Sequence, residues 1–207
     1  MLKIWGRTNS VNVQKVLWCA GELDLEHERI DAGLSYGRND EPWYLVLNPN
    51  GRVPLIQDDD FALWESNSIV RYLCAIHGYG SLYPTAPKDR AAAEKWMDWQ
   101  LSMLARPVGI AFWNLVRTAP GRRDDAAVAS AAEEANAAFS LLDAHLADHR
   151  HVAGDAFTMG DIPVGALAYR WTALDGVEQP TWPNLRRWQA ELAGRPAFRR
   201  HVMLPLS

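Results

Sequence analysis

Hydrophobic and polar positions follow two kinds of spacing along this chain, and the change between them falls near residue 78. Before that point, alternating stretches stand between stretches of helical spacing, whereas after residue 88 only helical spacing occurs. The alternation predicts strands over 2–5, 26–31, 55–57 and 61–64, and the helical spacing predicts helices over 13–20, 43–47 and 66–78. The sequence therefore predicts a small α/β unit followed by an all-α unit.

The order of these elements also predicts how the strands pair. A strand, a helix and a second strand follow one another over residues 2–31, and such a unit places its two strands parallel. The strands over 55–57 and 61–64 are separated by three aspartates, Asp58 to Asp60, which favours a hairpin. Residues 1–78 are therefore expected to contain both parallel and hairpin pairing.

The second part of the chain contains helices with recognisable boundaries. We predict helices over 89–117, over 124–149, after 158–161 and from 183 to about 194. Pro107 and Gly109 should kink or interrupt the first of them. Thr158 and Asp161 have the spacing of a capping box, with Asp in place of the usual Glu or Gln. We expect Asp161 to be structural, so that its replacement by alanine costs about 1 kcal/mol or more.

The segment 79–88 is the expected linker between the two units. It contains Gly80, Pro84 and Pro87, which interrupt both kinds of spacing. We therefore divide the chain into an α/β domain over 1–78, a linker over 79–88 and a helical domain over 89–207.

Composition and charge narrow the range of partners. The chain has 207 residues and a formal net charge of −4, which gives no electrostatic reason to expect nucleic acid or a membrane as the main partner. It contains no apolar run long enough for a transmembrane helix, and its first residues lack the apolar core of a signal peptide. Cys19 and Cys74 lie on apolar helical patterns and are expected to be buried free thiols, as in a reducing, cytoplasmic location.

The most informative segment runs from Asn48 to Ile56, and Glu65–Ser66 follows it. A proline cannot donate a hydrogen bond to a strand partner, so Pro54 belongs at the first residue of a strand or in a turn. Ser66 stands where a helix is predicted to start, and the free amides of a helix N-terminus attract an anion. Together these features predict a place where a small, extended, carboxylate-bearing molecule lies against the backbone.

Four pieces of the sequence, in order, are similar to the glutathione transferase family. They are the loop Thr8–Asn12 after the first strand, the segment Asn48–Pro54, the segment Glu65–Ile69, and the late capping box Thr158–Asp161. The resemblance covers essentially the whole chain and is closest to bacterial members of the serine or threonine type, which are theta-, delta- or nu-like. It implies a thioredoxin-like N-terminal domain, an all-α C-terminal domain, a homodimer, and glutathione bound between the domains without a metal ion.

The resemblance also implies roles for the residues that bind glutathione. Val53–Pro54 matches the cis-proline step of the family, which lets the backbone of Val53 pair with the cysteinyl part of glutathione like an added strand. Ser66 would bind the γ-glutamyl carboxylate, and Glu65 would face the γ-glutamyl ammonium group. Ser66 is also expected to cap the helix.

Two further positions are candidates for the same ligand. Arg52 lies one residue before Val53, where a basic residue can meet the glycyl carboxylate of glutathione. Asn67 follows Ser66 and is a weaker candidate for a contact with the γ-glutamyl group. No metal-binding spacing occurs among the six histidines.

The predicted catalytic position is the loop before the first helix. Glutathione reacts as its thiolate, and a hydroxyl or amide group that donates a hydrogen bond to sulfur favours the charged form. The match to the family places Ser10 in the hydroxyl position, with Asn12 as a second donor and Thr8 as a competitor. The loop contains neither tyrosine nor cysteine, which argues against the classes that use those residues.

The second substrate is expected to be a small hydrophobic electrophile above this loop. Candidates for its pocket, by family position, are Trp5, Arg7, Met103, Arg106, Pro107, Ile110 and Trp113. The predicted function is a glutathione transferase that activates the glutathione thiolate and conjugates it to the electrophile. The alternatives are a glutathione-dependent peroxidase or disulfide-bond reductase, and a non-catalytic protein that binds glutathione.

Overall fold

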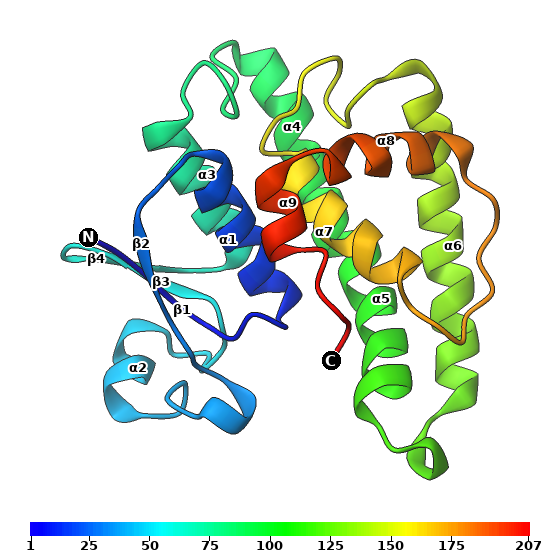
Figure 1. Cartoon of the computed structure of the whole chain (residues 1–207), viewed down its shortest axis with the longest axis horizontal. Coiled ribbons are helices and arrows are strands. Elements are labelled where there is room, and N and C mark those ends of the chain that lie inside the picture. Colours follow the sequence, from blue (N-terminus) through cyan, green and yellow to red (C-terminus); the bar gives the residue numbers. More distant parts are fainter.

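The computed structural model describes all residues from Met1 to Ser207 and has a sheet on one side and a group of helices on the other (Figure 1). The sheet contains β1 (Leu2–Trp5), β2 (His27–Ile30), β3 (Leu55–Asp58) and β4 (Phe61–Trp64) in the order β2-β1-β3-β4. This arrangement of a sheet domain and a helical domain confirms the predicted fold class.

The pairing of the strands also follows the prediction. β1 is parallel to β2, with Leu2 opposite His27, and antiparallel to β3, with Ile4 opposite Ile56. β3 and β4 form an antiparallel hairpin in which Leu55 lies opposite Trp64. The central position of β1 is consistent with the complete burial of Ile4.

Three α-helices accompany the sheet. α1 (Val11–Glu22) and α3 (Ser66–His77) pack against each other, whereas α2 (Pro42–Leu47) lies beyond the opposite side of the sheet (Figure 1). Cys19 and Cys74 meet between α1 and α3, with 3.5 Å between their sulfur atoms, and both are free and fully buried. The prediction of buried free thiols is confirmed.

The helical part contains six further α-helices and no strand. They are α4 (Pro87–Trp99), α5 (Ala105–Phe112), α6 (Asp125–Asp148), α7 (Asp161–Thr172), α8 (Pro183–Ala193) and α9 (Pro196–His201). The sequence did not predict α9, because Gly194 and Pro196 indicated only the end of α8. The chain instead restarts a helix with Pro196 in its first turn, where the missing N–H of proline has no cost. No helix has the length and apolar character needed to span a bilayer.

The predicted interruption at Pro107 and Gly109 is wrong in its position. Both residues lie inside regular α5, and the irregular turns are two π-helical segments, η2 (Gln100–Leu104) and η3 (Trp113–Arg117), on either side of it. Proline clashes with the carbonyl group four residues earlier, which is that of Met103 here. The wider turn of η2 contains that residue, so the irregularity precedes Pro107.

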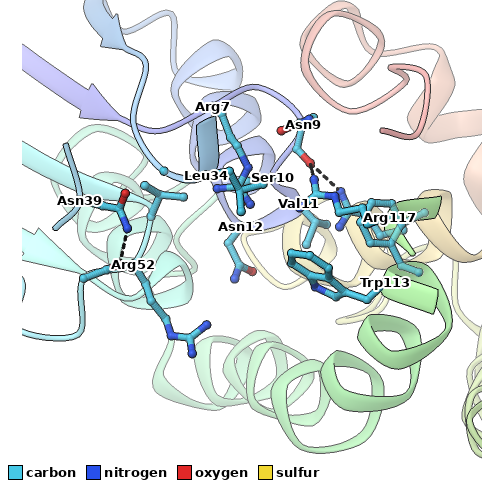
Figure 2. Close-up of a pocket in the computed structure, with 15 residues that line it drawn as sticks. Arg7, Asn9, Ser10, Val11, Asn12, Leu34, Asn39, Arg52, Trp113 and Arg117 are labelled. Atoms are coloured by element: carbon cyan, nitrogen blue, oxygen red, sulfur yellow. Dashed lines mark hydrogen bonds between the residues drawn. The ribbon is translucent and has the colours of Figure 1, made fainter. Parts of the chain in front are cut away.

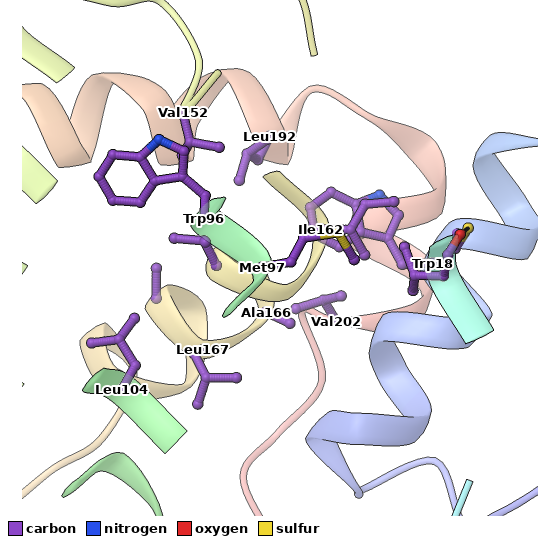
Figure 3. Packing of buried hydrophobic residues seen from close by; sticks show 14 of the residues in the cluster. Trp18, Trp96, Met97, Leu104, Val152, Ile162, Ala166, Leu167, Leu192 and Val202 are labelled. Carbon is purple, nitrogen blue, oxygen red and sulfur yellow. Dashed lines mark hydrogen bonds between the residues drawn. The ribbon is translucent and has the colours of Figure 1, made fainter. Parts of the chain in front are cut away.

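α7 joins the two parts of the molecule. It packs against α1 as well as against α4, α5 and α8, and nearly all of its residues are buried. Trp18 of α1 and Ile162 of α7 belong to the same hydrophobic cluster (Figure 3). A Cβ atom at Gly165 would lie 2.7 Å from the Leu192 side chain and 3.0 Å from the Trp18 ring, so a larger residue would require these side chains to shift. The α1 helix is therefore held firmly by the helical part of the chain.

The predicted capping box at the start of α7 exists in modified form. The Asp161 carboxylate accepts hydrogen bonds from the Thr158 N–H at 2.9 Å, the Val152 N–H at 3.0 Å and the Trp188 Nε1–H at 3.0 Å. The Thr158 hydroxyl accepts from the Gly160 N–H instead of the N–H of Asp161. Asp161 is completely buried, and these donors, with the Thr158 hydroxyl at 3.5 Å, satisfy its carboxylate oxygens.

Candidate functional site

The loop between β1 and α1 brings a hydroxyl group to the edge of the domain boundary. Ser10 occupies the N-cap position of α1 in an extended conformation, but its side chain makes no capping hydrogen bond. It is 7% exposed and lines a cavity of about 270 Å³. The Ser10 hydroxyl is therefore free to donate to a group in that cavity, next to the positive end of the α1 dipole.

The segment before β3 presents backbone to the same region. The Val53–Pro54 peptide bond is cis, as the resemblance implies. The carbonyl oxygen of Arg52 accepts hydrogen bonds from the Tyr44 hydroxyl and from Asn48 Nδ2, both at 2.7 Å. These two bonds tie the loop to α2 and fix the position of Val53.

The start of α3 places a carboxylate, that of Glu65, next to a helix N-terminus that attracts anions. Glu65 adopts a φ of 72°, which is uncommon for a residue with a side chain, and Ser66 is the first residue of the helix. Ser66 does not cap α3, so this part of the prediction is wrong: Glu65 occupies the N-cap position, and its side chain makes no capping bond either. Both side chains instead line a second cavity, with Val53 and Pro54.

Three neighbouring cavities adjoin one another at Asn12 and Arg52, which line all of them, and we refer to the three together as the cleft. The cavity of Glu65 and Ser66 lies at one end, and the cavity of Ser10 adjoins it. Figure 2 shows Asn12 and Arg52 extending into the space between the loop of Ser10 and the helix of Trp113. The cleft thus runs along the boundary between the sheet domain and the helical domain.

The far wall of the cleft comes from the helical part and is strongly basic. Phe112, Trp113, Arg117 and Arg170 line the cavity of Ser10, and Arg7 lies on its near wall. Burial, together with the neighbouring charges of Arg117 and Arg7, lowers the pKa of Arg170 to about 9. The cleft therefore combines one acidic end with one basic end.

The structure places seven of the nine predicted site residues along the cleft and two outside it. Ser10, Asn12, Arg52, Val53, Pro54, Glu65 and Ser66 line it. Thr8 is exposed and lines none of the three cavities. Asn67, in the first turn of α3, is buried and also lines none of them.

Asn67 belongs to a buried polar group at the domain boundary. Its Oδ1 accepts from Lys15 Nζ at 3.3 Å, and its Nδ2 donates to the Met97 carbonyl at 2.8 Å. Lys15 also donates to Gln100 Oε1 at 2.8 Å, and burial lowers the pKa of its ammonium group to about 7, partly offset by Glu65. The side chain of Asn67 is thus used inside the protein, where it links α3 to α1 and α4.

The predicted pocket for the second substrate is only partly correct. Arg7 and Trp113 line the cavity of Ser10, but the other five candidates do not. Trp5 donates to Gln57 and packs on Trp43, and Ile110 packs on the hydrophobic core. Met103 of η2 and Arg106 and Pro107 of α5 line a separate groove against α6.

Sequence reasoning missed the basic residues of the far wall. Arg117 and Arg170 lie more than 100 residues from Ser10, and no motif connects them to the loop. The sequence contains one signal for Arg170, which is the only charged residue between Ile162 and Thr172 in an otherwise mostly apolar helix. A lone charge on such a helix indicates a buried polar contact or a site.

Comparison with known proteins identifies the class that this fold and cleft define. Residues 1–75 match the model for the glutathione S-transferase N-terminal domain, and residues 84–196 match the model for the C-terminal domain. The chain is 46% identical to glutathione S-transferase GstB of Escherichia coli K12 over the whole length of both chains. It is 32% identical to glutathione S-transferase 3 of Zea mays, covering 97% of this chain and 93% of the relative.

A solved structure supports the same relationship. The theta class glutathione S-transferase of Xanthomonas axonopodis pv. citri, crystallised with glutathione bound, is 45% identical and superimposes with a TM-score of 0.96. The match covers 100% of this chain and 99% of that chain. The chain therefore belongs to the glutathione S-transferase family and is an enzyme of that class.

Proposed function

We propose that this glutathione S-transferase binds glutathione along the cleft and conjugates its sulfur to a small electrophile. Glu65 faces the γ-glutamyl ammonium group, and Ser66 with the N-terminus of α3 binds the γ-glutamyl carboxylate. The backbone of Val53 pairs with the cysteinyl residue, and Arg52 meets the glycyl carboxylate. The observation that carries this proposal is that the cavity of Glu65 and Ser66 and the cavity of Ser10 share Asn12, Arg52 and Val53 in their linings.

The unusual backbone of Glu65 supports this assignment. A φ of 72° in a residue with a side chain costs free energy, and such residues are concentrated at functional sites. The conformation turns the chain sharply between β4 and α3, so that the side chains of Glu65 and Ser66 line the same cavity. A carboxylate and a helix N-terminus side by side suit the two opposite charges of an amino acid.

The chemistry follows from the position of Ser10. Its hydroxyl donates a hydrogen bond to the sulfur of bound glutathione and stabilises the thiolate, while Asn12 is a second donor in reach of the same cleft. The thiolate attacks the electrophilic atom, the new carbon–sulfur bond forms, and the leaving group departs with the electron pair of its bond. The thiol proton passes to solvent, because the cleft opens to water.

Replacement of Glu65 or Ser66 tests the binding of glutathione. We expect Glu65→Gln and Ser66→Ala each to raise the Kd for glutathione about tenfold or more, because each removes one charge-assisted contact. Isothermal titration calorimetry measures this change. The matched control is Ser68→Ala, on the same helix but outside the cleft, which should leave the Kd unchanged. Equal affinities for all four proteins would contradict the proposed γ-glutamyl site.

The same resemblance leads us to propose a cytoplasmic homodimer whose domains meet at the linker 79–88. The support for a dimer is the groove that η2 and α5 form with α6, where the apolar side chains of Met103 and Leu141 are 50% and 54% exposed beside the Arg106–Glu134 ion pair. Exposed apolar side chains that gather in one groove are typical of a protein interface. A second copy of the chain is the proposed occupant.

Sedimentation velocity tests the dimer. We expect wild-type protein to sediment with twice the chain mass of 23.2 kDa, and Leu141→Glu to sediment as a monomer, because a buried unpaired carboxylate disfavours the interface. Met203→Glu, also an exposed apolar residue but outside the groove, should remain dimeric. A wild-type monomer, or a dimer that Leu141→Glu leaves intact, would contradict the proposed interface.

A further inference from the structure

Three arginines from distant segments line the cavity of Ser10 and form an arginine cluster around it. Arg7 follows β1, Arg117 ends η3 and Arg170 lies near the end of α7. With Arg52 they make four arginines in the lining, which contains no Asp or Glu. The chain as a whole has a net charge of −4, so this concentration of positive charge is local and opposes the overall balance.

Arg170 is a buried cation without an anionic partner. Its side chain is only 8% exposed, and its guanidinium group lies 4.1 Å from the centre of the Phe112 ring. Its one hydrogen bond is from Nη2 to the carbonyl oxygen of Asn9 at 3.2 Å, and its Nε–H has no partner. Buried charges are normally paired, so this arrangement is costly unless an anion enters the cavity.

The other two arginines have no Asp or Glu partner either. Arg7 makes no side-chain hydrogen bond, and its Nε–H is buried without a partner. Arg117 donates to an oxygen of Ser207, the last residue of the chain, at 2.8 Å and to the Asn9 carbonyl at 3.4 Å, while it stacks over Trp113 at 4.7 Å. Arg7 and Arg170 are therefore the two arginines without a carboxylate partner.

The position of Arg7 depends on Gly33, which has a φ of 86°. A Cβ atom at Gly33 would lie 2.8 Å from Arg7 Nη1 and 3.3 Å from the Val53 side chain. The glycine thus leaves room for the guanidinium group to reach the cavity beside Val53, where the sulfur of glutathione is proposed to lie. All three guanidinium groups therefore border the place where the second substrate must approach.

We propose that this arginine cluster is an anion subsite that selects electrophiles bearing a carboxylate group. The inference rests on the proposed function, because it places the electrophile beside the Ser10 loop. The planar fork of a guanidinium group matches a carboxylate with two parallel hydrogen bonds, and the rings of Phe112 and Trp113 hold the arginines in place. The carboxylate is the anchor of the substrate, and its electrophilic carbon faces the sulfur.

A binding experiment tests the subsite without any reaction. The probes are 3,5-dinitrobenzoate, which has no leaving group, and its neutral methyl ester, each titrated calorimetrically into enzyme saturated with S-methylglutathione. We expect the carboxylate to bind at least about tenfold more tightly than the ester, since hydrogen bonds to charged groups are of this strength. This preference should weaken with rising salt concentration.

Variants show whether the arginines cause the preference. Arg117→Gln and Arg7→Gln should each reduce the preference for the carboxylate over the ester several-fold. Two separate variants are used so that one still tests the subsite if the other fails to fold. Arg122→Gln is the matched control, because Arg122 is exposed and lines no part of the cavity. Equal binding of acid and ester, or an unchanged preference in both arginine variants, would overturn the subsite. So would binding of the benzoate to free enzyme that saturation with S-methylglutathione abolishes, because that result would assign the arginines to glutathione itself.

A kinetic comparison separates this inference from the proposed function. With glutathione, 4-chloro-3,5-dinitrobenzoate and its methyl ester each form a thioether and release chloride. We expect wild-type kcat/KM to favour the acid about tenfold or more over the ester after correction for the uncatalysed rates. Turnover of both substrates without preference would overturn the subsite and leave the transferase assignment intact. Turnover of neither would contradict the proposed function, while the binding experiment would still decide the subsite.

Discussion

Ser10→Ala is expected to lower kcat/KM for glutathione conjugation about 10²- to 10³-fold, the usual cost of removing one hydrogen-bond donor to a reacting anion. The Ser10 side chain makes no hydrogen bond within the protein, so the loss should be confined to chemistry. The pH at which kcat/KM reaches its plateau should rise in the variant, because the thiolate loses a donor that favours the charged form. Steady-state rates across pH measure both effects.

Two further variants make the Ser10 result specific. Ser10→Thr keeps a hydroxyl group and should retain much more activity than Ser10→Ala. Thr8→Ala removes the competing hydroxyl, which the structure places outside the cleft, and should act like wild type. A large loss in Thr8→Ala with an active Ser10→Ala would show that the wrong donor has been assigned. Thermal unfolding of all three variants should match wild type.

Asp161→Ala is expected to lower the free energy of unfolding by about 3–5 kcal/mol, because several buried donors lose their acceptor at once. The carboxylate accepts from two backbone N–H groups and from Trp188, and it is completely buried. Sequence alone indicated only a helix cap worth about 1 kcal/mol. The larger value follows from the contact with Trp188, which ties the start of α7 to α8.

Denaturant unfolding measures this loss, and the same loop supplies its control. Asp155→Ala removes an exposed carboxylate that makes no hydrogen bond, so it should change the free energy of unfolding by less than about 0.5 kcal/mol. Asp161→Asn keeps one acceptor oxygen, so its free energy of unfolding should lie between those of Asp161→Ala and Asp155→Ala. If Asp161→Ala is as stable as Asp155→Ala, the buried network does not stabilise the fold.

The strands and most helices could be predicted because their local patterns agree with the tertiary structure. The alternating residues of Leu2–Trp5 are the central strand, and the apolar face of α3 is the face that packs on α1. The errors lie where local signals compete. Pro107 indicated an interruption at its own position, but the wider turn of η2 takes up the clash before it. Pro196 marked the end of α8 but begins α9.

The candidate site was predictable on one side only. Ser10, Val53, Glu65 and Ser66 lie in short motifs of the sheet domain, and the structure brings them to one cleft. Arg117 and Arg170 reach the same cleft only because α7 packs between α1 and α5. No local pattern encodes that packing, so the sequence marks Arg170 only as an isolated charge, and the position of both arginines in the cleft comes from the structure. Asn67 is the opposite of Arg117 and Arg170. It is next to Ser66 in the sequence, yet its side chain lies outside the cleft.

Titration of the thiol of bound glutathione tests the central claim, that the Ser10 loop stabilises the thiolate. Ultraviolet difference absorbance follows thiolate formation in the saturated complex as pH is raised. We predict that wild-type enzyme lowers the thiol pKa by one unit or more from its free value of about 8.5, and that Ser10→Ala returns it most of the way. A bound thiol that ionises at the free value in wild-type enzyme, or at the same pH in both proteins, would contradict the account.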